Sequence, residues 1–462
     1  MTTDRSRRDV LRTGGTLFAG VAAVGAIGAG RPATASSSAS PRRVFPISDY
    51  GGAGDGTTDC TTAFAAAIAA CHAAGGGRVL VPAGRWVTGA IHLLSGVDLH
   101  VDAGATLLFS TDPRAYLPVV LSRWQGIELY NYSPLIYANG QRNISVTGSG
   151  VLDAQSDDEH WWFWIGSGQY GWKSGLPNQR DDWAALEQMG ADGVPPAQRV
   201  FGDGHYLRPS FIGLYNCVNV AVQGVTLRNS PMWNIQPVYC RGVTVDGVTV
   251  DSPGPNGDGC DPDSSRGVVI RRSTFATHDD CIAIKSGRDT DGARVGIPAR
   301  DILVEDCTFI SGGGAVAIGS EVSGGVSGVT ARRLRMPLAA SLDEASVQWV
   351  LSVKSTSSRG GYIRDVRVTD VDCPAWTYIP FEVTFTYEGA GASDNYPAVA
   401  GLSAARWKVG RSQQPYRIIG VADAPVRDVR IADCVFDDSA QAAQVEYTDG
   451  FTARDVTVRV AQ

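Results

Sequence analysis

Short runs in which β-branched residues alternate with polar ones recur along most of this chain. They begin at Asn143, Asn219, Gly242, Gly267, Asp301, Gly328, Asp365, Asp428 and Asp455. Alternation at every second position predicts β-strands, because successive side chains of a strand point to opposite faces. Most runs consist of two short strands joined by a two-residue polar turn, and they recur every 23 to 37 residues where no long insertion intervenes. The period predicts a repeat architecture.

Two repeat architectures are compatible with such strands. In a parallel β-helix each coil stacks its inward Val and Ile side chains on those of the coil below, so that the coils share one continuous core. A β-propeller is the alternative, but its blades need antiparallel hairpins and a period of about 40 residues. We therefore predict an all-β chain that forms a single parallel β-helix, or solenoid.

Three segments depart from the repeat. Residues 61–74 are rich in Ala, carry apolar side chains at helical spacing and precede three glycines, which predicts an α-helix that ends there. A helix before the first coil would cap the open edge of the solenoid, which would otherwise aggregate. Residues 155–212 and 376–425 are predicted to be long insertions, and loops of such length usually build a binding face.

The first 35 residues have the pattern of an export signal. Arg7 and Arg8 precede an uncharged stretch over residues 13–30, and a small-residue cleavage site ends at Ala35. The paired arginines favour the twin-arginine route, and the stretch is too weakly apolar to favour the alternative of a lone membrane anchor. We expect a secreted protein with a signal over 1–35, a linker over 36–45 and one β-helix domain over 46–462.

Composition excludes several classes of function. The formal net charge of −7 argues against general binding to nucleic acid or to an anionic membrane, so a polyanionic substrate would need a local basic patch. Nine cysteines occur without a CxxC or Cys/His cluster, so no zinc site is expected. Most are predicted to be buried apolar residues, while a disulfide between Cys60 and Cys71 stays open.

Acidic side chains concentrate in two segments about one repeat apart. Asp258, Asp261 and Asp263 lie in the first and Asp279 and Asp280 in the second, which places five carboxylates within 23 positions. Stacked coils would bring Asp258 beside Asp279 and Asp280, roughly 4.8 Å away along the axis. Such a concentration of acid is typical of a catalytic site. The alternatives are turn formation and calcium binding.

Four motifs of this sequence resemble the polygalacturonase family of glycoside hydrolases (family 28), which are pectin-lyase-like right-handed β-helices. The motifs are Asp49–Asp59, Asn256-Gly-Asp-Gly-Cys-Asp261, Asp279-Asp-Cys-Ile-Ala-Ile-Lys-Ser-Gly287 and Ile318–Val326, and the resemblance covers about residues 46–375. The insertion that carries Trp161, Trp162, Trp164 and Gly204-His-Tyr-Leu-Arg-Pro209 is most similar to the bacterial exo-acting branch.

The resemblance implies a hydrolase that cleaves O-glycosidic bonds of pectic polysaccharide, exo-acting and inverting, without a metal or cofactor and as a monomer. By position, Asp279 matches the general acid, and Asp258 and Asp280 match the pair that holds the attacking water. Inversion generally uses an acid and a base roughly 6.5–9.5 Å apart. Three carboxylates so close cannot all ionise easily, so the cluster is expected to keep one proton near neutral pH.

The resemblance also implies a set of substrate-binding residues, in which Lys354 matches the family lysine that holds the substrate carboxylate. The set is Lys354, Asn256, His278, Lys285, Arg288, His205 and Arg208. Alternatively, Lys285 and Arg288 are solvated charged residues of the surface. The Trp-rich insertion is either a sugar-stacking surface or the packing of a long loop. Asp261 and Asp263 are expected to be structural.

Three positions differ from the family pattern. The family's Gly-His-Gly falls on Gly312-Gly-Gly314, so the supporting histidine is absent. Ser352 replaces the arginine of the Arg-Ile-Lys motif, which removes a bidentate carboxylate contact. His278 stands where the family has Gly, and we hypothesise that it reaches the carboxylates in place of the missing histidine. These changes keep three alternatives open: a glycosidase of rhamnogalacturonan or substituted galacturonan, a non-catalytic polysaccharide-binding β-helix, and a calcium-dependent pectate lyase.

Overall fold

The computed structural model describes residues 43–338, 347–387, 389 and 393–461. All described residues belong to one compact unit, Arg42–Gln462. The predicted export signal over 1–35 therefore lies outside the described residues, as does most of the predicted linker. The last residues of that linker already belong to the fold, because strand β1 begins at Val44. Within the described ranges, no helix combines the length and the apolar character that a membrane crossing requires.

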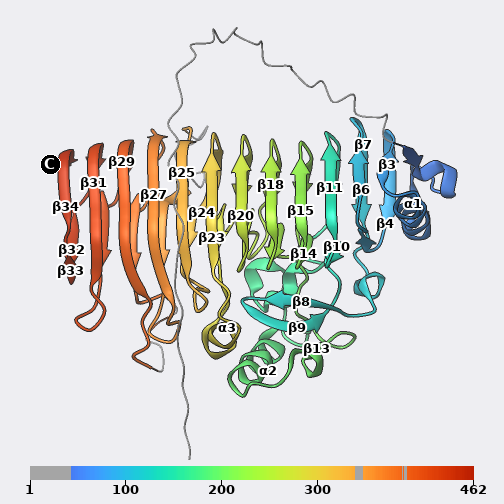
Figure 1. The fold of residues 1–462 in the computed structure, drawn as a ribbon, viewed down its shortest axis with the longest axis horizontal. Helices are drawn as coiled ribbons and strands as arrows, with labels where there is room; N and C mark the ends of the chain where they lie inside the picture. The colour runs from blue at the N-terminus through green and yellow to red at the C-terminus, as the bar shows by residue number, and fades with distance from the viewer. Residues whose placement is uncertain (1–42, 339–346, 388, 390–392, 462) are drawn as a thin grey trace, which may run out of the picture. The chain divides into compact units, whose positions relative to one another are not determined.

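Three ladders of parallel strands make up this unit, and Figure 1 shows them side by side from the first coil to the last. The first ladder consists of β1 (Val44–Pro46), β3 (Gly77–Val81), β6 (Val97–Val101), β11 (Arg142–Gly148), β15 (Val218–Gln223), β18 (Arg241–Asp246), β20 (Arg266–Arg271), β23 (Ala299–Glu305), β25 (Val326–Arg335), β27 (Tyr362–Cys373), β29 (Ala398–Ser412), β31 (Val426–Ser439), β33 (Thr448–Asp449) and β34 (Thr452–Val460).

The second ladder lies next to the first and merges with it after the eighth strand. It consists of β2 (Asp55–Asp59), β4 (Gly84–Thr88), β7 (Ala105–Phe109), β12 (Val151–Asp153), β16 (Thr226–Arg228), β19 (Thr249–Ser252), β21 (Thr274–Thr277) and the first part of β24 (Thr308–Ile318). In later coils the long strands β25, β27, β29 and β31 span both positions.

The third ladder carries the candidate site. It consists of β5 (Ile91–His92), β10 (Ile136–Asn139), β14 (Ile212–Tyr215), β17 (Ile235–Val238), β22 (Ala283–Ile284), the end of β24, β26 (Val347–Lys354), β28 (Phe381–Thr384), β30 (Tyr416–Ile419) and β32 (Gln444–Glu446). Bridges at Cys260 and Asp263 connect β17 to β22. The prediction of a right-handed parallel β-helix is confirmed, and the β-propeller is excluded because these ladders are parallel.

The core follows from the register of the ladders. One inward row of the first ladder pairs Val220, Val243, Val268, Ile302, Val329, Val366, Leu402 and Val429, all of them buried. Burying each such side chain stabilises the fold by about 1.5–3 kcal/mol. The residue that opens each predicted repeat, such as Asn219 (φ +57°) or Asp301 (φ +57°), has a left-handed backbone. The repeat therefore begins with Asn, Asp or Gly, which tolerate this conformation best.

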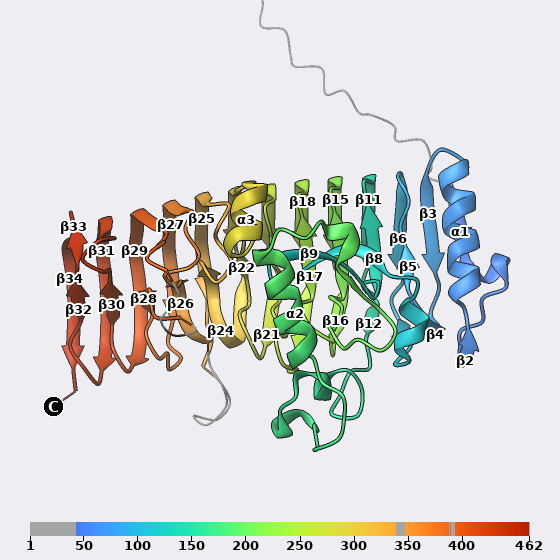
Figure 2. The same ribbon diagram turned by 90° about the horizontal axis from the view of Figure 1, so that it is seen from below.

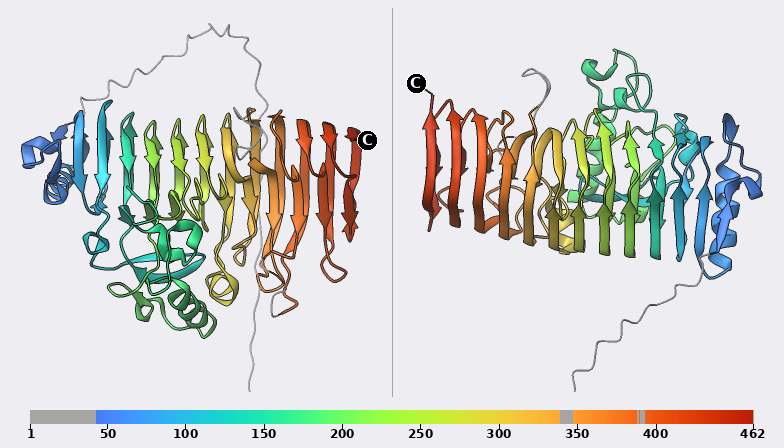
Figure 3. Two further views of the ribbon diagram at one scale, coloured as in Figure 1. Left: turned by 180° about the vertical axis from the view of Figure 1, so that it is seen from behind. Right: turned by 90° about the horizontal axis from the view of Figure 1, so that it is seen from above.

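The predicted capping helix is present as α1 (Thr61–Ala73). It buries Phe64, Ile68 and Cys71 against the end of the core, and Figure 3 shows it at the opposite end of the stack from the last coil. All nine cysteines are buried and free, so the structure contains no disulfide between Cys60 and Cys71.

Residues 155–212 leave the coils and form a compact lobe on one side of them. The lobe contains η3 (Trp162–Ile165), η4 (Gly168–Tyr170), α2 (Arg180–Ala191), η5 (Pro196–Gln198) and β13 (Val200–Phe201). Strand β13 pairs with a hairpin of β8 (Val120–Trp124) and β9 (Ile127–Asn131), which the repeat pattern did not predict. Figure 2 shows α2 across the coils of β16 to β21, and Leu186 of α2 shares a hydrophobic cluster with Trp233 of a coil.

The prediction of a long insertion over residues 376–425 is wrong. Strands β28, β29 and β30 occupy this stretch and pair in register with the coils on both sides. The pattern was missed because the segment Ala398–Ala405 carries Ala400 and Ser403 where the neighbouring coils carry Arg, and Ala404 where they carry Val368 and Ile431. Small residues give a weak strand signal.

The remaining short helices lie in connections. They are η1 (Ile47–Tyr50), η2 (Pro113–Tyr116) and α3 (Asp289–Val295). Helix α3 follows the coil that carries Asp279 and Asp280, and it faces the lobe because Asp291 accepts from Arg199 at 2.8 Å.

Candidate active site

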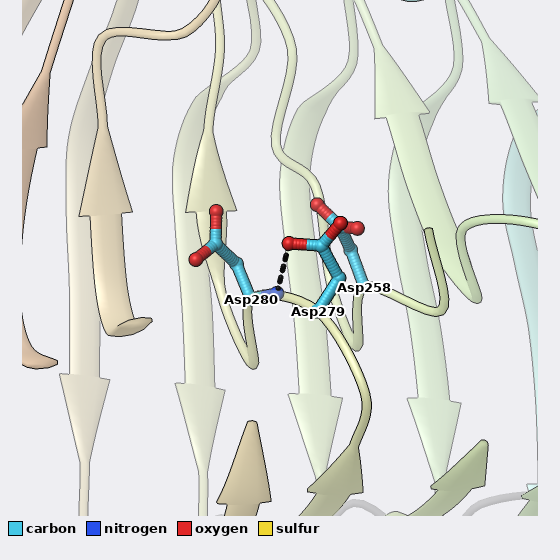
Figure 4. A group of neighbouring side chains, drawn as sticks. All are labelled: Asp258, Asp279 and Asp280. Atoms are coloured by element: carbon cyan, nitrogen blue, oxygen red, sulfur yellow. Dashed lines mark hydrogen bonds between the residues drawn. The ribbon is translucent and has the colours of Figure 1, made fainter. Parts of the chain in front are cut away.

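Asp258, Asp279 and Asp280 converge at the N-terminal edge of the third ladder. One oxygen of each lies within 4.8 Å of the others, and Figure 4 shows the three side chains on the same side of two adjacent coils. Asp280 donates its backbone N–H to Asp279 Oδ1 at 3.0 Å. The structure thus brings together the carboxylates that the sequence singled out.

The separation of these carboxylates is set by coil stacking. Gly259 N–H donates to Asp280 O at 3.0 Å, and Cys260 N–H donates to Cys281 O at 3.0 Å, so the two acidic segments are direct neighbours in the ladder. Adjacent parallel strands lie about 4.8 Å apart. The oxygens are therefore closer than the predicted acid–base separation of roughly 6.5–9.5 Å.

Asp280 is buried and held by two donors. Gly314 N–H donates to its Oδ1 at 2.7 Å, and Lys354 Nζ lies 2.8 Å from its Oδ2. The ammonium of Lys354 also lies 4.9 Å from the centre of the Tyr387 ring. Burial lowers the pKa of Lys354, but Asp280, Tyr387 and Asp279 together outweigh this effect and raise it. Lys354, predicted to hold the substrate, thus contacts a catalytic candidate directly.

Asp279 is less buried than its two neighbours and receives a second donor from Asn256. Asn256 Nδ2 lies 3.4 Å from Asp279 Oδ2, and Asn256 Oδ1 accepts from Arg208 at 2.7 Å. Because a guanidinium can only donate, Arg208 orients the Asn256 amide with its NH2 group toward Asp279.

Arg208 itself is fully buried. Its other hydrogen bonds go to Gln179 Oε1, Pro231 O and Pro255 O, and no ion pair with a carboxylate occurs within the described ranges. Burial lowers the pKa of Arg208 to about 9. The structure places Arg208 behind Asn256, where it acts on the site through that residue.

Lys285 lies at the centre of a buried acidic group. Its Nζ is 3.0 Å from Glu321 Oε2, 3.5 Å from Asp258 Oδ2 and 3.6 Å from Asp261 Oδ1. The ammonium also lies 4.2 Å from the centre of the Trp233 ring. Burial lowers the pKa of Lys285, but the surrounding carboxylates raise it well above its usual value. The alternative of a solvated surface lysine is wrong, because Lys285 is buried among these residues of neighbouring coils.

The carboxyl groups around Lys285 differ in proton affinity. Burial raises the pKa of Asp258 well above its usual value, and Asp261 adds to the shift. Burial also raises the pKa of Asp261 to about 8 against the effect of Lys285. Burial alone would raise the pKa of Glu321, but Lys285 and Arg288 lower it to about 2. Burial thus favours the protonated forms of Asp258 and Asp261, whereas Lys285 and Arg288 favour the ionised form of Glu321.

Arg288 and Asp263 join the lobe and the hairpin to the catalytic coil. Arg288 lies 2.9 Å from Glu187 of α2 and 3.6 Å from Glu321, so a solvated surface role is wrong for this residue as well. Asp263 forms a fully buried ion pair with Arg123 of β8 at 2.9 Å. The structural role expected for Asp263 agrees with this contact.

The two histidines of the predicted site lie away from the carboxylates. His278 is exposed, and its Nε2 bonds to the Tyr170 hydroxyl at 2.7 Å. The hypothesis that His278 replaces the family histidine is wrong, because its ring turns outward to the lobe. His205 Nδ1 lies 2.7 Å from Asp182 of α2, so this residue belongs to the interior of the lobe.

The lobe nevertheless reaches the site through Tyr170, a residue that the sequence did not single out. The Tyr170 hydroxyl lies 2.7 Å from Nε2 of His278, the residue before Asp279, and burial and then the charge of Asp279 raise the pKa of Tyr170. Tyr387 over Lys354 and Glu321 beside Lys285 were also missed as site residues. Glu321 lies in a motif that carries the resemblance, whereas Tyr387 lies in the stretch that was misread as an insertion.

Comparison with known proteins settles the family. Residues 202–389 match the family model described as Glycosyl hydrolases family 28. The solved structure of a hyperthermoactive exopolygalacturonase from Thermotoga maritima is 41% identical to this chain, with a TM-score of 0.86, over 91% of this chain and 92% of that one. This chain belongs to glycoside hydrolase family 28.

Curated relatives of this family 28 hydrolase agree with that result. A probable polygalacturonase of Vitis vinifera is 29% identical over 87% of this chain and 75% of its own length. An exo-poly-alpha-D-galacturonosidase of Dickeya chrysanthemi is 29% identical over 63% of this chain and 49% of its own length.

Two departures of this family 28 hydrolase from the family pattern have a structural basis. A Cβ at Gly313 would lie 2.8 Å from Asp280 Oδ1, so the site as built has no room for a histidine there. Ser352 is buried, and its hydroxyl has no hydrogen-bond partner among the residues that the structure describes. The ladder partners of Ser352 are Ala317 and Glu382, neither of which carries a positive charge.

Proposed function

We propose that this family 28 enzyme hydrolyses the galacturonan backbone of pectic polysaccharide from one chain end. The observation that carries the proposal is the convergence of Asp258, Asp279 and Asp280 within 4.8 Å. The Thermotoga exopolygalacturonase and the Dickeya galacturonosidase support the substrate class and the exo mode.

Exposure divides the roles among the three carboxylates. Asp279 is the general acid, because it is the least buried of the three and must reach the leaving oxygen. Asp258 and Asp280 are buried behind it and hold the attacking water. The water oxygen attacks the anomeric carbon, its proton passes to Asp280, and the proton of Asp279 passes to the departing glycosidic oxygen. Positioned acids and bases each contribute about 10²–10⁴-fold to such rates.

Lys354 supports the base, since an ammonium 2.8 Å from Asp280 stabilises negative charge on that carboxylate. We assign inversion because two carboxylates, Asp258 and Asp280, hold one water. The usual separation of acid and base in inverting enzymes, roughly 6.5–9.5 Å, is not the basis of this assignment, because coil stacking holds the oxygens closer together. The anomeric configuration of the first product, followed by NMR before mutarotation, tests it. A first product that retains the configuration of the substrate would contradict the assignment.

The position of the lobe supports exo action. Contacts from the lobe to the catalytic coils include Arg208 to Asn256 and Tyr170 to His278. Figure 1 shows the lobe beside the coils from β11 to β20 and not beside those from β25 to β34. The lobe blocks the substrate on that side of the carboxylates. The substrate chain can therefore extend only along the later coils, so cleavage occurs near a chain end.

A second candidate is favoured by Ser352. The position lacks the family arginine, while Lys285 and Lys354 already pair with carboxylates of the enzyme. A neutral sugar on one side of the scissile bond would suit this charge balance, so the alternative substrate is rhamnogalacturonan.

Product analysis on polygalacturonate and rhamnogalacturonan, with Asp279→Asn as the control, tests these proposals. Release of saturated monogalacturonate by the wild type alone is the expected result. Activity confined to rhamnogalacturonan would support the second candidate, and unsaturated products that vanish with a calcium chelator would indicate a lyase. Secretion through the signal over residues 1–35 and a monomeric state stay predictions. Mass spectrometry of the exported protein and light scattering test them.

A further inference from the structure

One outer row of the third ladder runs through the catalytic carboxylates into the later coils. The pairing of Ala283 with Ala317, read back along both strands, places Asp280 opposite Gly314, and Cys281 N–H donates to Gly314 O at 2.8 Å. Gly314 in turn pairs with Trp349 of β26. Asp280, Gly314 and Trp349 are therefore neighbours in three successive coils.

Trp349 emerges on the same face as the catalytic carboxylates. A Cβ at Gly314 would lie 3.1 Å from Asp280 Oδ1, so that face of Gly314 looks toward the site. Partners in a parallel register point their side chains to the same face of the sheet. Trp349 is half-buried and, unlike Val350 and Leu351 beside it, does not belong to the hydrophobic core.

Two further aromatic side chains extend this position into the next coil. Tyr378 N–H donates to Gln348 O at 2.9 Å, and the rings of Trp349 and Tyr378 lie 6.2 Å apart, nearly perpendicular. The Tyr378 ring is 6.5 Å from that of Trp376. Trp376 is 40% exposed and Tyr378 37% exposed, and neither belongs to a hydrophobic cluster of the described residues. Both rings therefore offer accessible apolar surface beside Trp349.

We propose that Trp349, Trp376 and Tyr378 form a second saccharide-binding site, here called the aromatic subsite. It binds a sugar ring of the polysaccharide chain whose end lies at Asp258, Asp279 and Asp280, and it thus rests on the proposed function. Coil spacing places it roughly 10–14 Å from Asp280, beyond the sugars that flank the scissile bond. Gly314 carries no side chain between the two sites, so the substrate can pass along the row.

The chemistry of the aromatic subsite suits a sugar. Aromatic rings offer large apolar faces with few rotatable bonds, and the C–H face of a pyranose is their complement. Stacking does not require a charge, so the subsite accepts galacturonate or a neutral sugar. The lobe occupies the opposite side of the carboxylates (Figure 1), which leaves the direction of the aromatic subsite for the rest of the chain.

The dependence of KM on substrate length tests the aromatic subsite. Trp349→Ala and Trp376→Ala are compared with wild type on galacturonate oligomers from the dimer to the hexamer. Each variant is expected to raise KM for the longest oligomers about 2- to 10-fold, the effect of one lost aromatic contact, and to leave kcat and dimer hydrolysis unchanged. The matched control is Tyr447→Ala, since Tyr447 is a 57% exposed aromatic of the last coils, and it should match wild type at every length.

Equal KM values for variants and wild type at all lengths would overturn the proposal, and so would an equal loss on dimer and hexamer. A wild type inactive on every galacturonide would contradict the proposed function instead. Binding of Asp279→Asn protein to polygalacturonate and to rhamnogalacturonan, with and without Trp376→Ala, then decides the aromatic subsite separately. If Asp279→Asn/Trp376→Ala binds either polymer more weakly than Asp279→Asn, the aromatic subsite is supported. If the two proteins bind both polymers equally, the subsite is refuted.

Discussion

Replacement of Lys285 by Met tests the charge balance beneath the catalytic carboxylates. The ammonium of Lys285 is 4% exposed and lies 3.0–3.6 Å from Glu321, Asp258 and Asp261. Methionine keeps most of the apolar stem that packs against Trp233 but removes the positive charge. Three buried carboxyl groups then lose the cation that they share.

The magnitude follows from Glu321. Its pKa of about 2, against an ordinary 4.5, corresponds to about 3 kcal/mol of native-state stability at neutral pH, at about 1.4 kcal/mol per unit. Lys285 is the largest cause of this depression. Removal of one partner from a buried ion pair typically costs about 3–5 kcal/mol. We therefore expect Lys285→Met to lower the free energy of unfolding by about 3 kcal/mol at pH 7.

The pH dependence of the stability difference distinguishes a lost charge interaction from a packing defect. A carboxyl group with a depressed native pKa contributes stability above its unfolded pKa, and this contribution is lost as pH falls through the folded pKa. The difference between wild type and Lys285→Met should therefore be full above about pH 5 and shrink toward pH 2.

Denaturant unfolding of wild type, Lys285→Met and Lys408→Met between pH 3 and 7 provides the assay. Lys408 is an exposed lysine of β29, and its replacement should change stability by less than about 0.5 kcal/mol. The reasoning fails if Lys285→Met is as stable as Lys408→Met at pH 7. It also fails if the deficit stays constant down to pH 3.

Three further changes probe neighbouring contacts. Gly313→Ala should lower kcat with little change in KM, because the new Cβ would lie 2.8 Å from Asp280 Oδ1 and would displace that oxygen. The control is Gly168→Ala, where a Cβ meets nothing within 4 Å, and it should retain full activity in the same assay. Asp261→Asn should flatten the stability profile between about pH 4 and 8, because a raised carboxyl pKa makes the wild type lose up to about 1.4 kcal/mol per pH unit there; an unchanged slope in denaturant titrations would contradict this. His278→Ala should leave the pH–rate profile unshifted, since its ring bonds to the lobe, and a shifted acid limb would reopen a role at the carboxylates.

The sequence predicted those parts of the fold that depend on local pattern. Alternation of Val and Ile predicts the ladders, and a separation of about one repeat predicts that Asp258 meets Asp280, because both statements need only the period and the stacking distance. The capping helix follows from its Ala content and the glycines after it. Each of these features is encoded within a few residues of where it occurs.

The contacts that the sequence did not predict join segments far apart in the chain. Lys285 is buried by its contacts with Asp258, Glu321 and Trp233 of neighbouring coils, and periodicity does not reveal which polar side chains a stack of coils will bury. The outward turn of His278 depends on Tyr170, more than 100 residues earlier. The coils of β28 to β30 were missed because β29 carries Ala400 and Ser403 at outward positions where the neighbouring coils carry Arg, which weakens the alternation of polar and apolar residues.

Coil stacking has a consequence for how this protein can change over evolution. A β-helix grows or shrinks by whole coils, since each coil contacts only its neighbours and a duplicated coil keeps the core continuous. A duplication between Asp258 and Asp279 would keep the core intact and still abolish the active site, because the carboxylates would be two coil spacings apart. Lineages of this protein can therefore lengthen near either end, while the boundary between these two coils tolerates no inserted repeat.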